Sequence, residues 1–266
     1  MEGIGLIAGD GNFPIILSNG LREKGKRVIA VGLENITSPA LEKCVERLHW
    51  IKIGQLGRLI KIFKKEGINR VVMAGKVSKT FMFKDIRPDL RAITLYLKLK
   101  DRKDDSLLLG IVSELEKEGI KVEEPTRYVP HLLAEKGVIT KRKPKKKELK
   151  DIEFGWPIAK EMGRLDIGQT VVVKERAVLS VEAIEGTDAA IRRAGELGRG
   201  GIVVIKVAKP KQDMRFDAPV IGLNTIRTLK EAKAAALCVE AGKTILLEKE
   251  DMIKLADKEN ICIIGM

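Results

Sequence analysis

The chain has 266 residues, enough for one large domain or two small ones, and 44% of them are hydrophobic, which is typical of a folded protein. The 50 lysines and arginines exceed the 37 aspartates and glutamates, so the formal charge of +13 would attract nucleic acid, acidic membranes or phosphorylated substrates. Six Phe, two Tyr and two Trp disfavour a dedicated single-strand nucleic-acid binder. Because neither a membrane-spanning run nor a signal-peptide pattern is found, we expect a cytoplasmic protein.

Cysteine and histidine are too scattered to build a soft-metal site. Cys44, Cys238 and Cys262 have no CxxC spacing, so neither a thiolate zinc site nor a disulfide framework is expected, and we expect buried, inert thiols. His49 and His131 have no His or Cys partner at ligand spacing. Carboxylates are therefore expected to bind any metal ion.

Predicted strands and helices alternate through the first half of the chain. Apolar runs predict strands at residues 4–8, 27–31, 50–53, 71–74 and 120–123. Helical periodicity predicts helices at residues 13–24, 55–65, 90–100 and 106–118. This alternation is typical of a parallel sheet with helices on its faces, so we expect residues 1–130 to form a Rossmann-like domain.

A basic segment follows this domain. It is rich in Pro, Lys and Arg, and the heptapeptide Lys141–Lys147 is too charged to pack in a core. We therefore expect a linker at residues 131–150. A solvated loop is the simpler interpretation of the heptapeptide, and attraction to an acidic membrane surface is a second one.

The second half predicts another α/β domain, over residues 151–266. Expected strands cover residues 170–174, 177–183, 201–208, 243–247 and 261–264. Expected helices cover residues 156–163, 189–197, 225–237 and 251–258. The first two strands resemble a hairpin, so the sheet should be mixed. The predicted fold class is α/β, with a Rossmann-like parallel-sheet domain followed by an α/β domain with a mixed sheet.

A dense cluster of polar residues occupies residues 209–222, directly after a predicted buried strand. Its polar members include Lys209, Gln212, Asp213, Arg215 and Asp217. Because open α/β sheets bind ligands at the carboxyl ends of their strands, this cluster is a candidate site for metal and phosphate. An ordinary solvated loop has a similar composition, and the segment alone does not separate the two interpretations.

Two glycine-containing turns follow N-terminal strands. The segment Gly9–Pro14 lacks a complete GxGxxG pattern, and Lys76 lacks the spacing of a Walker A loop. Backbone amides in such turns can approach a phosphate near a helix N-terminus, although a simple tight turn fits the first segment equally well. The candidate phosphate-binding residues are Gly9, Gly11, Asn12, Gly75, Lys76 and Ser78.

Thr187 and Asp188 precede a further helical pattern. Thr187 is a good N-cap, and Asp188 lies in the first turn, where negative charge is stabilising. If the sheet brings Asp188 close to Asp213 and Asp217, the three carboxylates can share Mg²⁺, which prefers oxygen ligands. Capping and metal binding both stay open for this segment.

Six motifs, in order, resemble those of a known family. They are Gly5–Gly9, Ala74–Ser78, Gly163–Gln169, Val181–Asp188, Lys209–Gln212 and Asp217–Gly222. Together they cover essentially the whole chain and resemble the UDP-2,3-diacylglucosamine pyrophosphatase family of lipid A biosynthesis. The resemblance is to its two-domain type, which is unrelated to the calcineurin-like phosphoesterases. Asp10 departs from the family's usual run of consecutive glycines in the first turn.

The resemblance implies Mg²⁺-dependent hydrolysis of UDP-2,3-diacylglucosamine to UMP and 2,3-diacylglucosamine 1-phosphate, in a cleft between two domains. Asp217 matches the family's required aspartate. The expected catalytic residues are Asp217, Asp188, Lys209 and Gln212. The expected metal ligands are Asp217, Asp213 and Asp188, and Thr187 and Arg215 join the expected substrate contacts. The implied partner is a lipid-linked nucleotide sugar at the anionic inner-membrane surface, met by a peripheral cytoplasmic protein, with a homodimer as one expected assembly.

Two other interpretations stay open from the sequence. A nonenzymatic nucleotide- or sugar-phosphate-binding regulator would keep both glycine turns and use the acidic cluster only as a loop. A basic nucleic-acid binder ranks third, and we expect no nucleic-acid partner. Metal-dependent turnover would exclude the regulator, whereas polynucleotide binding with a steep salt dependence would support the nucleic-acid binder.

Overall fold

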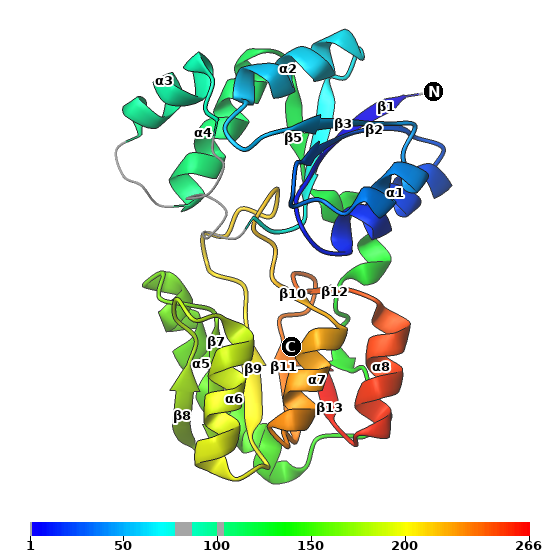
Figure 1. Cartoon of the computed structure of the whole chain (residues 1–266). Helices are drawn as coiled ribbons and strands as arrows, with labels where there is room; N and C mark the ends of the chain where they lie inside the picture. The colour runs from blue at the N-terminus through cyan, green and yellow to red at the C-terminus, as the bar shows by residue number, and fades with distance from the viewer. Residues whose placement is uncertain (1, 78–86, 100–103) are drawn as a thin grey trace. The chain divides into compact units, whose positions relative to one another are not determined.

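The chain forms two compact units (Figure 1). The computed structural model describes residues 2–77, 87–99 and 104–266. The first unit comprises Met1–Pro130 with Met214–Phe216, and the second comprises His131–Asp213 with Asp217–Met266. Residues 131–150, expected as a linker, are thus grouped with the second unit.

The first unit contains a five-stranded parallel sheet in the order β3-β2-β1-β4-β5. Its strands are β1 (Gly3–Ala8), β2 (Arg27–Leu33), β3 (Arg47–Ile51), β4 (Arg70–Ala74) and β5 (Lys121–Glu123). This is a doubly wound order, in which the direction of winding reverses between β1 and β4. The predicted Rossmann-like parallel sheet is confirmed.

Helices cover both faces of this sheet (Figure 1). They are α1 (Phe13–Glu23), α2 (Leu56–Lys65), α3 (Leu90–Lys98) and α4 (Asp104–Lys117). The first unit also contains the short 3-10 helices η1 (Pro39–Cys44) and η3 (Pro125–Arg127), and η4 (Pro130–Leu132) spans the boundary to the second unit. The apolar residues of α2 recur at helical spacing and form one buried stripe, as the sequence predicts. Phe63 of α2 is completely buried in a cluster with Val71 and Leu115, which joins α2 and α4 to the sheet.

The second unit contains a six-stranded mixed sheet in the order β6-β13-β11-β9-β7-β8. Its strands are β6 (Gly137–Val138), β7 (Thr170–Lys174), β8 (Ala177–Val181), β9 (Val203–Lys206), β11 (Ala236–Val239) and β13 (Cys262–Gly265). β9, β11 and β13 are parallel, whereas β7 and β8 form the predicted antiparallel hairpin. A small parallel pair, β10 (Val220–Ile221) and β12 (Ile245–Leu246), lies outside this sheet.

Two helical layers enclose the mixed sheet. The helices are α5 (Lys146–Arg164), α6 (Thr187–Gly198), α7 (Leu223–Glu231) and α8 (Lys249–Lys258). Ile152 and Ala159 of α5 pack in one cluster with the strands, while Ile191 of α6 and Leu229 of α7 belong to a second cluster. The unit is therefore a three-layer α/β/α arrangement.

Helix α5 begins well before its predicted start at Trp156, so that prediction is corrected. The Glu148 carboxylate accepts the Lys145 backbone N–H at 2.8 Å and the Arg142 guanidinium at 3.0 Å. A carboxylate in the first turn satisfies a helix-end amide and offsets the local positive charge. Part of the basic run can therefore enter a helix despite its composition.

The predicted helix at 225–237 merges two elements. α7 ends at Glu231, Lys233 adopts a left-handed backbone with φ of 50°, and Ala236–Val239 is a fully buried strand. Alanine favours a helix by propensity, but burial in the middle of the parallel sheet overrides that preference here.

The cysteines are free thiols with different exposure. Cys238 and Cys262 are buried, as expected, whereas Cys44 is only partly buried. Burial raises the pKa of Cys238 to about 12, which keeps it protonated and unreactive at neutral pH. Over the described ranges, every helix is too short or too polar to cross a membrane.

Candidate active site

The two glycine turns of the first unit meet where the winding of its sheet reverses. One follows β1 and the other follows β4, and these strands are neighbours. The Asp10 N–H donates to the Lys76 carbonyl at 2.8 Å, and the Lys76 N–H donates to the Asp10 carbonyl at 3.0 Å. Doubly wound sheets bind ligands at this switch point. The turns contain the predicted residues Gly9, Gly11, Asn12, Gly75 and Lys76. The predicted residue Ser78 lies outside the described residues.

Close backbone packing explains the glycines at this contact. A Cβ on Gly9 would lie 2.6 Å from the Lys76 carbonyl oxygen. Gly75 has a φ of 93°, and a Cβ there would lie 2.7 Å from the Gly9 carbonyl carbon. Both positions lack room for a side chain, and at Gly75 the left-handed backbone also disfavours one.

Asp10 already uses one of the amides that the first turn offers. Its carboxylate Oδ1 accepts the Gly11 N–H at 2.7 Å. The departure from consecutive glycines therefore has a structural consequence, because an anion at this helix N-terminus would compete with Asp10 for that amide.

In the second unit, Asp217 lies in a network of amide side chains after β9. Gln212 Nε2 donates to Asp217 Oδ2 at 3.0 Å, and it is 3.3 Å from Gln169 Oε1. Gln212 Oε1 in turn accepts the Lys209 backbone N–H at 2.8 Å. The Asp217 backbone N–H donates to the Asp213 carbonyl at 2.9 Å. Gln212 thus fixes the orientation of the Asp217 carboxylate relative to the loop.

Lys209 is oriented from the loop that follows α5. Its ammonium contacts Asp166 Oδ1 at 2.7 Å. A Cβ on Gly163 would lie 3.2 Å from the Lys209 Cα, so the end of α5 packs closely on the polar loop. Asp166 and Gln169 were not among the predicted site residues, although both lie in a motif that supported the family resemblance. That motif pointed to the positions of these two residues, but it did not show which groups they contact.

Arg215 is grouped with the first unit, as part of Met214–Phe216. Its Nη1 lies 3.1 Å from Glu116 Oε1 of α4. Phe216 packs against the apolar cluster between α4 and the parallel sheet. Arg215, which was predicted to contact substrate, is therefore paired with Glu116 of the first unit in this structure.

A buried polar cluster that sequence analysis missed lies at the end of β9. Lys206 is 4% exposed and donates to Thr187 Oγ1 at 2.7 Å, and Thr187 donates to Glu182 Oε1 at 2.8 Å. Lys206 Nζ and Glu182 Oε2 are 4.0 Å apart. Gly186, and not Thr187, is the N-cap of α6, so the capping prediction for Thr187 is wrong, while Asp188 does lie in the first turn. Thr187 instead connects two buried charges.

Burial alone would raise the pKa of Glu182, but its surroundings reverse that effect. The Lys206 ammonium, the Thr187 hydroxyl and the Gln169 backbone N–H all favour the ionised carboxylate, so the pKa of Glu182 lies below its usual range. Because Gln169 also approaches Gln212 through its side chain, this charged pair is joined to the network that holds Asp217.

The predicted metal ligands do not form a protein cage by themselves. Within the described ranges, no group of three or more His, Cys, Asp or Glu side chains is arranged to hold a metal ion. Magnesium, however, often takes one or two carboxylates and completes its shell with water and substrate phosphate. Asp217, a partly exposed carboxylate, fits that mode of binding.

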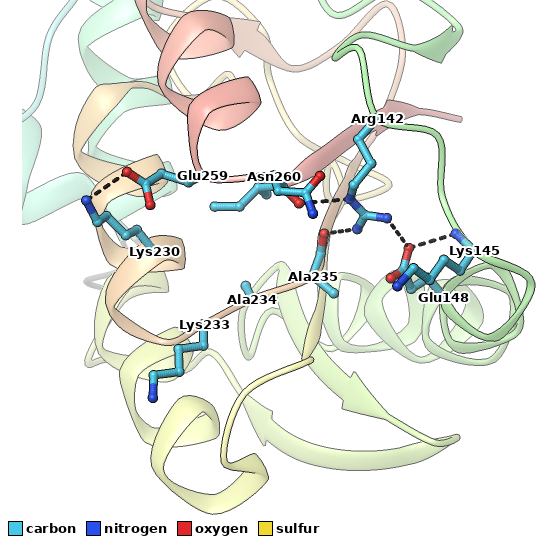
Figure 2. Close-up of a pocket in the computed structure, with 10 residues that line it drawn as sticks. Arg142, Lys145, Glu148, Lys230, Lys233, Ala234, Ala235, Glu259 and Asn260 are labelled. Atoms are coloured by element: carbon cyan, nitrogen blue, oxygen red, sulfur yellow. Dashed lines mark hydrogen bonds and ion pairs between the residues drawn. The ribbon is translucent and has the colours of Figure 1, made fainter.

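A cavity of about 340 Å³ lies at the opposite edge of the mixed sheet (Figure 2). It is lined by Ala235 and Ile261, which precede the amino ends of β11 and β13. Figure 2 shows Arg142 engaged with the carbonyls of Ala235 and Asn260 and with Glu148. This arginine satisfies carbonyl groups at the sheet edge, so the cavity is separate from the candidate site at the carboxyl ends of the strands.

The fold and site define an α/β protein of two units, with phosphate-compatible turns in one and an oriented aspartate in the other. The LpxI N-terminal domain model matches residues 3–132, and the LpxI C-terminal domain model matches residues 135–264. The chain is also 34% identical, over 277 aligned residues, to the UDP-2,3-diacylglucosamine pyrophosphatase LpxI of Caulobacter vibrioides. The alignment covers 100% of this chain and 98% of that protein. The chain belongs to the LpxI family.

One of the solved structures that the chain matches is only weakly similar. The N5-carboxyaminoimidazole ribonucleotide synthetase of Thermotoga maritima matches with 15% identity, a TM-score of 0.29, and coverage of 70% of this chain and 42% of that one. A similarity of this size supports no inference about function.

The contact between the glycine turns generates a stability prediction. We expect Gly75→Ala to lower the free energy of unfolding by about 2–4 kcal/mol, because the left-handed backbone and the close contact with Gly9 both oppose a Cβ. Gly67→Ala is the control, since Gly67 also has positive φ but no atom within 4 Å of its Cβ position. Gly67→Ala should lower the free energy of unfolding, measured with urea, by about 1 kcal/mol. Equal losses of unfolding free energy in the two variants would show that the contact between Gly75 and Gly9 is not important for stability.

The low pKa of Glu182 generates a pH prediction. A carboxyl whose pKa falls on folding stabilises the protein above its ordinary pKa, and the stabilisation is lost as pH falls through the folded-state pKa. Glu182→Gln should therefore lower the free energy of unfolding at neutral pH by about 3 kcal/mol, since Lys206 stays buried without its partner. The deficit should shrink below the usual glutamate pKa of 4.5. Urea unfolding of both proteins from neutral pH to below pH 4.5 tests this prediction, and Glu196→Gln, at an exposed position, is the control. A loss of unfolding free energy that does not change with pH would refute the ionic explanation.

Proposed function

We propose that this protein hydrolyses the pyrophosphate bond of UDP-2,3-diacylglucosamine, yielding UMP and 2,3-diacylglucosamine 1-phosphate in lipid A biosynthesis. The observation that supports this most strongly is family membership over both units, together with the full-length similarity to a relative of that named activity. The site chemistry agrees, because pyrophosphate hydrolysis requires cations, an oriented carboxylate and water, and does not require histidine.

In the proposed mechanism, Asp217 is the catalytic carboxylate. Gln212 holds one of its oxygens at 3.0 Å, which leaves the other oxygen to orient water or to contact a cation. Lys209 would approach the pyrophosphate and exchange its contact with Asp166 for one with phosphate oxygen. Positioning and charge compensation of this kind account for most of phosphoryl-transfer catalysis.

Asp188 and Lys206 have supporting places in the proposal. Asp188 follows Thr187 in the first turn of α6, so it is adjacent in sequence to a member of the buried Lys206 network. The buried Lys206–Glu182 pair would keep the floor of the site rigid, and its connection through Gln169 would limit movement of Gln212. Preorganised groups of this kind do not have to rearrange as the transition state forms, so little free energy is spent on reorganising the site.

We also propose that Mg²⁺ acts with this site. Asp217 would supply the main protein oxygen, with Asp213 and Asp188 as further candidates, and substrate phosphates and water would complete the shell. When bound, the ion would offset the negative charge of the pyrophosphate. The orientation of Asp217 by Gln212 suits this role, because ligating carboxylates are commonly held by a second hydrogen-bonded group.

The uridine nucleotide is assigned, in this proposal, to the first unit. Gly9, Gly11, Asn12, Gly75 and Lys76 lie at the switch point of a doubly wound sheet, where such folds bind nucleotides. Because the substrate carries acyl chains, we further propose peripheral association with the anionic inner membrane from the cytoplasmic side. Exposed lysines of the Lys141–Lys147 segment would contribute to that attraction.

Replacement of Asp217 tests the catalytic assignment. Asp217→Ala should reduce UMP release from purified substrate by at least about a hundredfold, while thermal unfolding stays close to wild type because the side chain is partly exposed. Asp251→Asn is a matched control, an exposed aspartate on α8 in the same unit. Asp188→Ala and Lys209→Ala should reduce turnover by smaller factors. Turnover near wild type in folded Asp217→Ala would remove Asp217 from the mechanism.

Metal removal tests the proposed cofactor separately. Treatment with a chelator should stop UMP release, and added Mg²⁺ should restore it. Gln212→Ala should raise the Mg²⁺ concentration needed for half-maximal rate, because Asp217 loses the donor that orients it. Full activity after exhaustive chelation would contradict the Mg²⁺ assignment. Binding of UDP-2,3-diacylglucosamine without any turnover, with or without metal, would favour the regulatory alternative.

A further inference from the structure

Helix α3 of the first unit presents an apolar face to solvent. Leu90 is 84% exposed, Ile93 is 42% exposed and Leu97 is 78% exposed. Residues at this spacing share one side of a helix. Leu95, on the other side, is buried against the core that contains α2 and α4. A typical surface helix turns its polar side outward, so α3 carries the opposite pattern on its outer side.

The helix is firmly attached to its unit, so this exposure is not the result of a detached element. Asp89 caps it, with Oδ1 accepting the Ala92 N–H at 2.9 Å and Oδ2 accepting the Gly57 N–H at 2.7 Å. Arg91 pairs with Glu114 of α4 at 2.8 Å and with Glu118, the residue directly after α4, at 2.7 Å. These bonds fix the rotation of α3 and hold the leucines outward.

Cations flank the apolar face. Arg87 precedes the helix, Lys98 ends it, and both are exposed. Beside the face lies a cavity of about 300 Å³, lined by Leu90, Arg91, Thr94, Leu95, Lys98 and Glu114. Glu114 is held by Arg91 and Lys117, and Asp89 is occupied in capping. Arg87 and Lys98, exposed at the two ends of the face, are placed to contact lipid phosphates.

We propose that the outer face of α3 docks on an anionic phospholipid bilayer. Leu90, Ile93 and Leu97 enter the boundary between headgroups and acyl chains, while Arg87 and Lys98 contact lipid phosphates. Short apolar stripes with flanking cations bind membranes by this combination of burial and electrostatics. The choice of a bilayer rests on the proposed function, because a lipid-linked substrate resides in a membrane.

The size of the face argues against a stable interface with a second copy. A helix of nine residues is about 14 Å long. Stable interfaces bury about 800 Å² on each partner, which is more than three aliphatic side chains supply. A membrane has no such minimum area, because each inserted side chain adds to binding independently.

Vesicle binding by the full chain, without substrate, tests the proposal. The double variant Leu90→Gln/Leu97→Gln keeps the net charge and replaces exposed side chains only. Its binding to phosphatidylglycerol-containing vesicles should fall about a hundredfold or more, because each leucine contributes about tenfold or more. Lys98→Gln should weaken binding to these vesicles but not to neutral phosphatidylcholine vesicles. Leu197→Gln, at a 63% exposed leucine on α6, is the matched control and should bind as wild type.

A fluorescence measurement locates the contact. Leu97→Trp should show a blue-shifted emission on vesicles and quenching by brominated acyl chains, whereas Leu197→Trp should show neither. Equal vesicle binding by wild type and by the folded double variant would overturn the proposal. A shift from dimer to monomer in the double variant would also overturn it, in favour of a second copy.

Enzyme assays separate this inference from the proposed function. With substrate in detergent micelles, the double variant should release UMP at the wild-type rate, and with substrate in vesicles it should be slower. If wild type releases no UMP in either assay, the proposed function fails, whereas vesicle binding still decides whether α3 is a docking surface. Loss of activity in micelles together with wild-type vesicle binding would contradict the docking proposal.

Discussion

Parallel pairing places the carboxyl ends of neighbouring strands on one edge of a sheet, and the candidate residues of each unit depend on this constraint. In the first unit it brings together the turns after β1 and β4, where Asp10 and Lys76 exchange backbone hydrogen bonds. In the second unit β9 ends at Lys206, and the polar loop that follows carries Gln212 and Asp217. The buried strands fix these positions, so the loops are free to carry chemistry.

Compensation of charge is the second requirement of the site. Lys206 is buried with Glu182 and Thr187, while Lys209 reaches Asp166 at the surface. The buried pair is expensive to desolvate, and the surrounding contacts favour the ionised form of Glu182. We interpret it as a rigid support beneath a loop whose exposed groups can change partners when a pyrophosphate binds.

A protein that handles a lipid-linked nucleotide needs polar and apolar contacts on different surfaces. The second unit supplies an oriented carboxylate, and the first supplies both a nucleotide-compatible switch point and the outward leucines of α3. Under the proposed function, the polar groups would contact the pyrophosphate, and the apolar face would take up the lipid side. The exposed leucines would be a liability in a protein with no such partner, since isolated apolar faces favour aggregation.

The sequence by itself determined the α/β class and the hairpin, and it carries the motif from which Asp217 was predicted as a catalytic residue. It did so because apolar periodicity and short motifs are local properties, as the buried stripe of α2 illustrates. Only the tertiary structure decided that Thr187 joins Glu182 to Lys206, because these residues are separated in sequence and meet through the sheet. The early start of α5 and the end of α7 were decided in the same way, by Glu148 and by the burial of β11. Long-range packing can override local propensity. It also decides which side of a helix faces the core. For this reason the spacing of the α3 leucines did not reveal that they face solvent.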